Sequence, residues 1–478
     1  MTSDLRPYPE YKDSGLPWLG RVPSHWKLRR AKYLYREVDE RSQSGEEELC
    51  SVSHKTGVTP RKENVTMFMA ESTVGHKIIR PNDLAINTLW AWMAALGIAR
   101  QVGVVSPAYG VYRPLPDSEL VPDFADKLLR IEEYKAEYMA RSTGINASRL
   151  RLYPDQFLRI PLLVPTHDEQ VAIAHYLDGM DQKVRRFIRN RRRLIEVLNE
   201  QKQAIINRAV TRGLDPNAPL KPSGIDWLGD IPEHWDVRRL RNVADMRVSN
   251  VDKHTKESEF AVRLCNYTDV YKNTVITADM PFMTATATRD EIEAFRLRVG
   301  DVIITKDSED WQDIGVPALV AETADDMVCG YHLAILRPRL NRIKGRFLSY
   351  AMQCRGVVAQ LSLAANGVTR YGLSHGAIKA ISLPTPPVDE QEPIAEYIDE
   401  ATASLNDAID RAKREIDLIR EYRTRLIADV VTGKVDVRAL APAESPLDDE
   451  QIDEGIDDEE MMGDDEPELV EEAADADD

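Results

Sequence analysis

The chain has 478 residues, and its 62 Lys or Arg against 80 Asp or Glu give a formal net charge of −18 at pH 7. This length is too great for one hydrophobic core and predicts two or three domains, while the longest apolar stretches fall short of the roughly 18–20 residues that a membrane span needs. The four cysteines are scattered without metal-ligand spacing, which predicts reduced thiols in a cytoplasmic protein.

A tryptophan-containing block opens the chain and returns later in the same register. Residues 14–30 read Ser-Gly-Leu-Pro-Trp-Leu-Gly-Arg-Val-Pro-Ser-His-Trp-Lys-Leu-Arg-Arg, and residues 223–239 read Ser-Gly-Ile-Asp-Trp-Leu-Gly-Asp-Ile-Pro-Glu-His-Trp-Asp-Val-Arg-Arg. Two Trp, one His and one Pro in common register identify an internal repeat. Because both copies share them, we interpret Trp18, Trp26, Trp227 and Trp235 as structural packing residues.

A β-rich region follows each block. Short β-branched runs bounded by Gly, Pro or Asp predict strands at 102–105, 302–305 and 333–336, and amphipathic patterns predict short helices at 123–140 and 344–363. Matches between the two regions are sparse, with Asp83 and Gly97 paralleling Asp301 and Gly315. The two halves are therefore predicted to share one fold while the sequences between the repeated blocks differ.

A long helical pattern begins at each Asp-Glu-Gln sequence, at 168–170 and at 389–391. Apolar residues then recur at 3–4 spacing over about six heptads, which predicts a coiled-coil-like seam. The two acidic residues lie at the positive end of each helix, and Pro393 is expected in the first turn of its helix.

The two predicted helices carry opposite net charges, which favours pairing them with each other. Residues 168–212 hold ten basic and six acidic side chains, and residues 389–434 hold seven and twelve. Two separately solvated helices remain the alternative.

The end of the chain is strongly acidic. Residues 441–478 contain 19 Asp or Glu and no Lys or Arg, so the body of the chain has 62 basic against 61 acidic residues. This composition predicts a disordered tail, with mimicry of DNA or binding of a basic partner as the alternatives. The predicted fold class is α+β, with domains at 1–166 and 214–388, a long helix after each at 167–213 and 389–434, and a tail at 435–478.

The repeated Trp-Leu-Gly-x-x-Pro-x-His-Trp block and the Pro-x-x-x-Glu-Gln start of each long helix resemble the specificity subunits of Type I restriction–modification systems. Further matching motifs lie at 49–53, 57–61, 87–97, 105–109, 142–146 and 367–370. The likeness spans about residues 10–436; each motif alone is weak, but their order and duplication are specific. The acidic tail is not part of the family pattern.

The resemblance implies two β-rich target-recognition domains, each reading one half of a bipartite site in double-stranded DNA. It also implies that the two helices pack antiparallel as a ruler for the unread spacer. Two methyltransferase subunits are the implied partners, and translocating nuclease subunits can join them. S-adenosylmethionine, Mg²⁺ and ATP would be bound by those partners, so no cofactor, metal or catalytic site is expected in this chain. Two modules related by a pseudo-twofold axis contact DNA as symmetric dimers do.

Candidate DNA contacts are polar, basic or aromatic residues in predicted loops, because Arg and Lys pair with guanine edges or phosphates and Asn pairs with adenine. They are His54, Lys55, Arg61, Lys62, Asn87, Trp90 and Arg149 in the first domain, and Arg263, Asn266, Tyr267, Lys306, Trp311, Arg370 and Tyr371 in the second. For any one of them, a solvated surface position or, for the Trp residues, a core position is the alternative.

Two other classes of function stay open, a stand-alone enzyme and a scaffold. A stand-alone nuclease is suggested by Pro122-Asp123 with Glu133 and Lys135, which fit a loose PD…ExK pattern, but the latter two lie in a helical stretch and such sites need groups converging on Mg²⁺. The sequence has no phosphate loop and no Asn- or Asp-Pro-Pro-aromatic motif for amino methylation, so a methyltransferase would need an unrecognised site. A coiled-coil scaffold that does not contact DNA is the remaining alternative.

Overall fold

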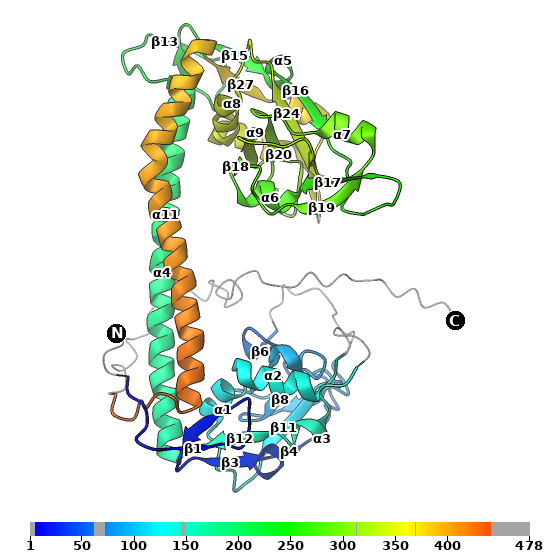
Figure 1. Cartoon of the computed structure of the whole chain (residues 1–478), viewed down its shortest axis with the longest axis vertical. Helices are drawn as coiled ribbons and strands as arrows, with labels where there is room; N and C mark the ends of the chain where they lie inside the picture. The colour runs from blue at the N-terminus through cyan, green and yellow to red at the C-terminus, as the bar shows by residue number, and fades with distance from the viewer. Residues whose placement is uncertain (1–4, 62–71, 145–149, 312, 369, 441–478) are drawn as a thin grey trace. The chain divides into compact units, whose positions relative to one another are not determined.

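The computed structural model describes residues 5–61, 72–144, 150–311, 313–368 and 370–440, and it divides into two compact units (Figure 1). Unit 1 comprises Met1–Arg189 and Glu415–Asp478, and unit 2 comprises Asn190–Arg414. The division passes through both long helices, α4 (His167–Arg212) and α11 (Val388–Val431). The predicted mixture of strands with long helices is confirmed. No helix in these described ranges is long and apolar enough to cross a membrane.

In its described residues, unit 1 contains short antiparallel strands and three short helices besides its segments of α4 and α11. A four-stranded sheet in the order β4-β11-β8-β9 forms its centre, and four two-stranded ribbons surround it. The strands are β1 (Tyr11–Asp13), β2 (Arg21–Pro23), β3 (Lys27–Arg30), β4 (Tyr35–Glu37), β5 (Cys50–Ser53), β6 (Gly57–Pro60), β7 (Lys77–Ile79), β8 (Leu84–Ile86), β9 (Leu96–Ile98), β10 (Gly103–Val105), β11 (Gly110–Pro114) and β12 (Pro161–Val164). The helices are α1 (Pro122–Leu128), α2 (Glu132–Arg141) and α3 (Pro154–Phe157), with 3₁₀ turns at Ala31–Tyr33 and Ala91–Met93.

Unit 2 has a larger central sheet of five strands in the order β16-β24-β20-β22-β18, with two three-stranded sheets, β19-β17-β23 and β21-β26-β25. Its strands are β13 (Leu220–Pro222), β14 (Asp230–Pro232), β15 (Asp236–Arg239), β16 (Ala244–Val248), β17 (Phe260–Cys265), β18 (Val275–Ile276), β19 (Met283–Ala287), β20 (Val302–Thr305), β21 (Asp307–Ser308), β22 (Pro317–Val320), β23 (Met327–Cys329), β24 (Leu333–Pro338), β25 (Ala365–Gly367), β26 (Tyr371–Leu373) and β27 (Ser382–Thr385). Its helices are α5 (Leu240–Val243), α6 (Tyr267–Lys272), α7 (Arg289–Phe295), α8 (Gly345–Gln353), α9 (Arg355–Ala364) and α10 (His375–Ala380).

The predicted strands are observed as β10, β20 and the start of β24, but each predicted short helix is split in two. Residues 123–140 form α1 and α2, because buried Ile131 adopts an extended backbone between them. Residues 344–363 form α8 and α9, because Cys354 is extended. The break brings Gly356 so close to the Trp227 ring that a Cβ atom there would lie 1.6 Å from a ring carbon. Tertiary packing thus overrides the local helical period.

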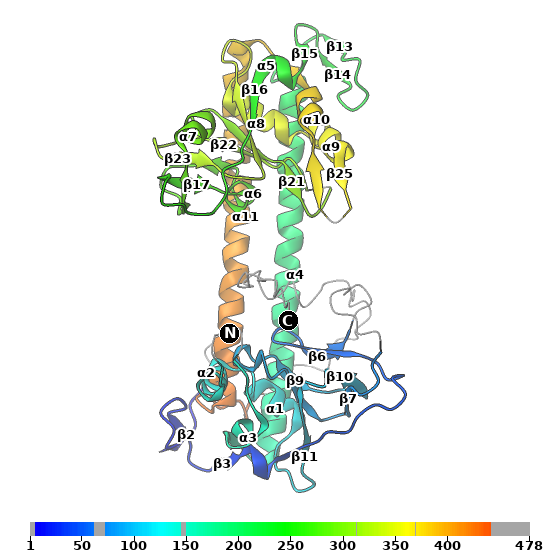
Figure 2. The ribbon, with the colours of Figure 1, turned by 90° about the vertical axis from the view of Figure 1, so that its right-hand side faces the viewer.

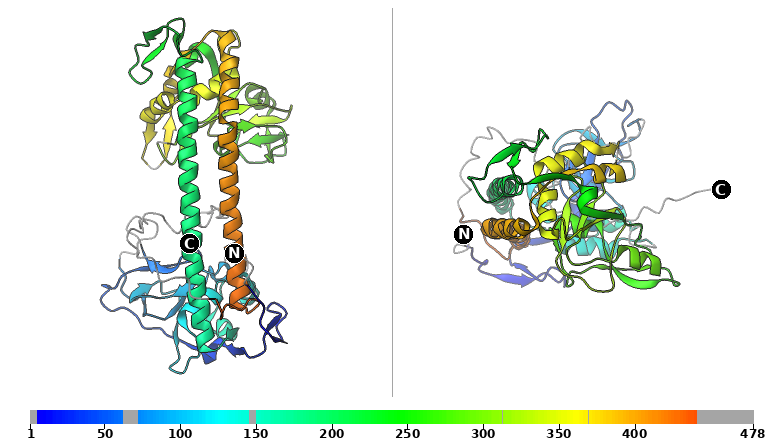
Figure 3. Two further views of the ribbon diagram at one scale, coloured as in Figure 1. Left: turned by 90° about the vertical axis from the view of Figure 1, so that its left-hand side faces the viewer. Right: turned by 90° about the horizontal axis from the view of Figure 1, so that it is seen from above.

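Within each unit a segment of α4 lies beside a segment of α11 (Figure 3). In unit 1 the first half of α4 meets the last half of α11, where Arg423 forms an ion pair with Asp181. In unit 2 the second half of α4 meets the first half of α11, where burial and the nearby Lys413 lower the pKa of Lys202. One predicted seam residue, Leu194, is instead 38% exposed.

The position of Pro393 corrects a prediction. Helix α11 begins at Val388, so Pro393 is its sixth residue and lies in the second turn rather than the first. Its missing N–H therefore falls where an intrahelical hydrogen bond would form, instead of among the N–H groups that a helix start leaves unbonded anyway.

The repeated tryptophans are packing residues, as predicted. Trp26 and Trp235 are fully buried, and each lies against the glycine that ends a long helix. Gly213, which follows α4, and Gly433, which follows α11, have φ angles of +69° and +78°, and a Cβ atom on either would lie 3.0 Å from a Trp ring. Glycine suits these positions because it adopts the left-handed conformation without a steric penalty.

A buried glutamine at the start of each long helix ties that helix to the globular part of its unit. The side-chain oxygen of Gln170 accepts a hydrogen bond from the backbone N–H of Val121 at 2.7 Å, and its amide donates to two backbone carbonyls. In unit 2 the oxygen of Gln391 accepts from the N–H of Lys344 at 2.7 Å, and its amide also donates to two carbonyls. The same anchor is therefore built twice.

A buried aspartate before a central strand is the second contact that occurs in both units. Asp83 precedes β8 and accepts two hydrogen bonds from Arg113 of β11 at 2.8 and 2.9 Å. Asp301 precedes β20 and accepts two from Arg337 of β24 at 2.7 and 2.9 Å. A two-point Arg–carboxylate contact fixes orientation as well as distance, so both central sheets share one geometric constraint.

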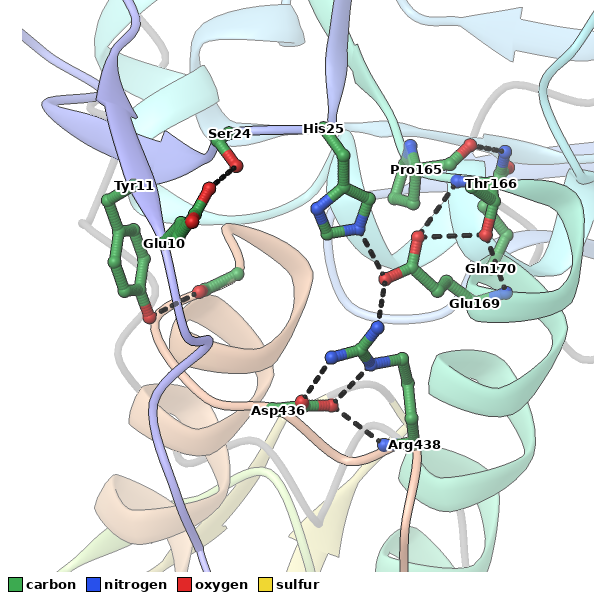
Figure 4. Close-up of polar contacts among 11 residues, drawn as sticks. Glu10, Tyr11, Ser24, His25, Pro165, Thr166, Glu169, Gln170, Asp436 and Arg438 are labelled. Carbon is green, nitrogen blue, oxygen red and sulfur yellow. Dashed lines mark hydrogen bonds and ion pairs between the residues drawn. The ribbon is translucent and has the colours of Figure 1, made fainter.

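The residues that follow α11 contact the start of α4 in unit 1 (Figure 4). Glu169 accepts a hydrogen bond from His25 at 2.7 Å and lies 3.6 Å from Arg438. Arg438 also pairs with Asp436 at 2.6 Å and lies over the Tyr8 ring. Burial raises the pKa of Glu169, but hydrogen bonds from His25 and a neighbouring Thr outweigh burial and leave that pKa below its ordinary value.

Replacing Glu169 by Gln is expected to lower the free energy of unfolding of unit 1 and to make that free energy less dependent on pH in the acid range. Since the folded-state pKa of this carboxyl is lowered, its contribution is fully present above the ordinary pKa of 4.5 and is lost as the pH falls through the lowered value. We expect a loss of about 1–2 kcal/mol at pH 7 that shrinks toward pH 3, measured by urea unfolding. The matched variant Glu390→Gln removes a carboxylate that is 39% exposed, and should cost less.

Candidate nucleic-acid interface

The turn between β5 and β6 carries the first two candidate residues of unit 1, His54 and Lys55. Both are partly buried. The guanidinium of Arg130 donates hydrogen bonds to their backbone carbonyls, at 2.8 Å and 2.6 Å respectively. Gly57 has a φ of +74°, which turns the chain into β6. Because Arg130 holds both backbone carbonyls, His54 and Lys55 belong to a turn whose main chain is fixed in place.

A second group in unit 1 gathers around Tyr109. Its hydroxyl oxygen accepts a hydrogen bond from the Asn87 side-chain amide at 3.1 Å. Burial raises the pKa of Tyr109, and the nearby positive charge of Arg61 opposes that shift. Trp90, which follows Asn87 on the same loop, is 38% exposed. The structure thus brings Arg61 and Asn87 together, while Lys62 and Arg149 lie outside the described residues.

Three candidate residues of unit 2, Tyr267, Arg370 and Tyr371, gather at the small sheet β21-β26-β25, whose strands Figure 2 shows beside α9. Tyr371 of β26 pairs in register with Ser308 of β21. The hydroxyl of Tyr267 hydrogen-bonds to Ser308, and Arg370 lies close enough to oppose the rise that burial causes in the pKa of Tyr267. Residues from three separate stretches of the sequence therefore meet at one place.

One further aromatic ring packs on Tyr267, and two more exposed rings lie three residues after Ser308 and just before β24 in the sequence. Tyr267 stacks on Tyr271, with ring centres 5.6 Å apart and an interplanar angle of 15°. Trp311 is 41% exposed and Tyr331 is 53% exposed. Exposed rings beside Lys and Arg side chains are suited to contact with bases and phosphates.

A charged cluster underlies the same surface. The carboxylate of Asp307 accepts hydrogen bonds from the Lys306 ammonium at 2.7 Å and lies 2.5 Å from the His332 ring nitrogen Nδ1. Burial raises the pKa of Asp307, but these two contacts outweigh burial and hold it below the ordinary value. Lys306 was predicted from the sequence; Asp307 and His332 were not.

Two predicted contacts in unit 2 have structural partners. Arg263 forms hydrogen bonds with both carboxylate oxygens of Asp326 at 2.8 and 2.9 Å, and another with the carbonyl of Ala278. Asn266 caps the start of α6 through a reciprocal contact with Asp269. Their DNA contact remains a prediction, but each side chain already has a role in the fold.

The loose nuclease pattern is not assembled into a site. Asp123 pairs with Arg100, Lys135 pairs with Glu132 at 2.7 Å, and Glu133 lies 3.6 Å from Lys434. Among the described residues, no group of three or more His, Cys, Asp or Glu side chains could hold a metal ion.

Several side chains at these surfaces were missed because their partners are distant in sequence. Arg130 lies 76 residues from His54, and no local pattern links the two. His332 lies 25 residues from Asp307 and is placed there by the pairing of β20 with β24. Tyr271 carried a weak signal, since it lies one helical turn after Tyr267.

Comparison with known proteins gives consistent matches. Residues 232–417 match the family model described as the Type I restriction modification DNA specificity domain. The chain is 24% identical over 321 residues to a specificity subunit named MjaX of Methanocaldococcus jannaschii, covering 65% of this chain and 66% of the relative. It is 22% identical over 324 residues to the type I restriction enzyme MjaVIII specificity subunit of the same organism, covering 65% and 70%. The chain thus spans about two thirds of the length of these relatives.

A solved structure also resembles this chain. It comes from a study of complex assembly and conformational transition of the type I R-M system, and it matches with a TM-score of 0.56. The sequence identity is 16%, and the alignment covers 86% of this chain and 98% of that chain. At this identity the match shows a shared fold.

Replacing Arg130 by Met is expected to loosen the β5–β6 turn without unfolding unit 1. Hydrogen bonds from a charged donor contribute roughly 1.5–3 kcal/mol each, so the backbone at residues 54–57 should exchange its amide hydrogens at least about tenfold faster. Hydrogen-exchange mass spectrometry measures this directly. Arg100→Met, which removes an exposed ion pair elsewhere in unit 1, is the control and should leave the turn unchanged. Equal exchange in both variants would contradict the assigned role.

Proposed function

We propose that this chain is a specificity subunit of a Type I restriction–modification system and that it reads a bipartite, asymmetric DNA target on behalf of partner subunits. Those partners would carry out adenine methylation and DNA cleavage. The observation that carries the proposal is that the same anchoring contacts occur in both units, whereas the accessible or partly buried side chains near them differ.

The anchoring contacts are the Gln at each helix start, the Asp–Arg pair in each central sheet and the buried Trp at each helix end. Apart from these shared contacts, the units differ. Unit 1 has the β5–β6 turn with His54 and Lys55, held by Arg130, and unit 2 has the group around Tyr267 and Arg370. Similar scaffolds with different contact groups suit two half-sites of different sequence, since specificity comes from the side chains that reach base edges.

We further propose that α4 and α11 form one antiparallel coiled coil that separates the two recognition units related by a pseudo-twofold axis. Support comes from the Arg423–Asp181 pair in unit 1, from the proximity of Lys202 to Lys413 in unit 2, and from the opposite net charges of the helices. A helix rises about 1.5 Å per residue, so such a pair would set the length of the unread spacer.

Partners would supply the chemistry. Two methyltransferase subunits would dock on this chain and bind S-adenosylmethionine, and translocating nuclease subunits would bring Mg²⁺ and ATP. The chain itself is proposed to be non-catalytic and to act in the cytoplasm, where DNA and these partners meet. The predicted tail comprises residues 435–478. Its first residues, 435–440, are ordered in unit 1, where Val437 is buried, and residues 441–478 lie outside the described residues.

Methylome sequencing of cells that express variants of this chain tests the proposal. Cells with the chain should show one bipartite methylated motif that is absent from cells without it. Lys55→Ala should relax the half of the motif read by unit 1, and Arg370→Ala should relax the other half, each by about 10- to 100-fold in discrimination, as expected for one lost base contact. Arg339→Ala is the control, because Arg339 pairs with Asp245 on the surface of unit 2.

Other outcomes would support the alternatives. Methylation or cleavage by the purified chain with S-adenosylmethionine and Mg²⁺ would identify an enzyme. An unchanged motif after exchange of residues 40–140 with those of a relative would indicate a scaffold that does not read DNA.

A further inference from the structure

We propose that Asp307 is a positioning residue that holds Lys306 and His332 in the orientation required for specific DNA recognition by unit 2. This inference rests on the proposed function and adds to it a role for a carboxylate, a group that phosphates repel. A negative charge at such a surface is disfavoured for DNA binding unless it organises positive groups around it.

The contacts show that Asp307 bridges two separate segments. Its two oxygens lie 2.7 Å from the Lys306 ammonium, and one of them lies 2.5 Å from Nδ1 of His332. All three side chains are mostly buried, with 15%, 19% and 21% exposed for Asp307, Lys306 and His332. A charged cluster with so little solvent contact has well-defined side-chain positions.

The backbone around the cluster is equally constrained. The N–H of Lys306 donates to the carbonyl of His332 at 2.8 Å, and the carbonyl of Lys306 accepts from the N–H of Leu373 at 2.9 Å. Asp307 pairs in register with Gly372, where a Cβ atom would lie 2.9 Å from a carboxylate oxygen. The absence of a side chain at Gly372 therefore leaves room for the Asp307 carboxylate to reach its partners.

His332 adopts a conformation that needs support. Its φ is +68°, in the left-handed region that residues other than glycine seldom occupy. The ring of exposed Tyr331 lies 3.6 Å from the His332 ring, centre to centre. Because Asp307 accepts the hydrogen on Nδ1, the other ring nitrogen, Nε2, is left to contact a ligand.

The cluster adjoins the three candidate residues that gather at the small sheet of unit 2. Ser308, the neighbour of Asp307, hydrogen-bonds to Tyr267 and pairs with Tyr371, and Arg370 lies near Tyr267. The Lys306 ammonium has three N–H donors, so it can donate to a phosphate or a base edge while it pairs with Asp307, and Nε2 of His332 can contact the same ligand.

This arrangement predicts a split effect of Asp307→Asn on two kinds of DNA. Binding to DNA without the target should be equal to wild type or stronger, because a charge that repels phosphate is removed. Binding to the target should be about tenfold weaker, because Lys306 and His332 lose the group that orients them. Simple destabilisation of unit 2 would lower both affinities together.

The experiment measures binding of the full-length chain, in complex with its methyltransferase partners, to two duplexes. One duplex contains the bipartite motif identified by methylome sequencing, and the other has the half of that motif read by unit 2 scrambled. Asp245→Asn is the matched control, since it removes an Asp that pairs with the exposed Arg339 of unit 2, and neither residue is a candidate DNA contact. Nitrogen NMR of the His332 ring, in wild type and in Asp307→Asn, reports whether the Nδ1 contact is lost.

The outcomes are distinct. A tenfold loss on the target duplex only, with a shifted His332 resonance and a normal control, supports the positioning role. Lys306→Met and His332→Asn should each reproduce part of the loss of affinity for the target duplex. Adding Asp307→Asn to the Lys306→Met/His332→Asn double variant should weaken that affinity little further. Undiminished discrimination by Asp307→Asn, or an equal loss on both duplexes, overturns the role. If the wild-type complex does not discriminate between the duplexes, the proposed function itself fails.

Discussion

One buried amide side chain fixes the direction of each long helix relative to the globular part of its unit. Gln170 and Gln391 are fully buried, and each satisfies one backbone N–H and two backbone carbonyls that would otherwise lack partners. A buried backbone polar group without a hydrogen bond costs about as much as the bond itself. Any rotation of the helix relative to the sheet would break several such bonds at once. The direction of each helix is thereby fixed relative to the strands of its own unit.

The interface residues can differ between units because these anchors do not involve them. The Asp–Arg pairs and the helix-start glutamines lie in the cores, whereas the β5–β6 turn of unit 1 and the β21-β26-β25 sheet of unit 2 have no counterpart of matching sequence. Core packing tolerates little change in volume, while exposed loops tolerate a great deal. Divergence at the surface is therefore compatible with a preserved scaffold.

Local patterns predicted much of the fold. The β-branched run at 302–305 is β20, and the 3–4 period after each Asp-Glu-Gln is a continuous helix. The breaks at Ile131 and Cys354 could not be predicted, because they follow from packing against residues far away in the sequence. The candidate site was predicted less completely for the same reason. Lys306 and Tyr267 were found by residue type, but Arg130 and His332 act through partners that only the sheet pairing brings near.

The position of Gly433 against Trp26 has a consequence for biosynthesis. Unit 2 is one continuous stretch, Asn190–Arg414, but unit 1 needs residues from both ends of the chain. Domains usually fold in the order in which the ribosome releases them. Here the core of the first-made unit includes Val430 and Val431, so it is completed only after the whole of the second unit has emerged. The nascent first unit must therefore leave part of its apolar core uncovered until residues 190–414 have been synthesised.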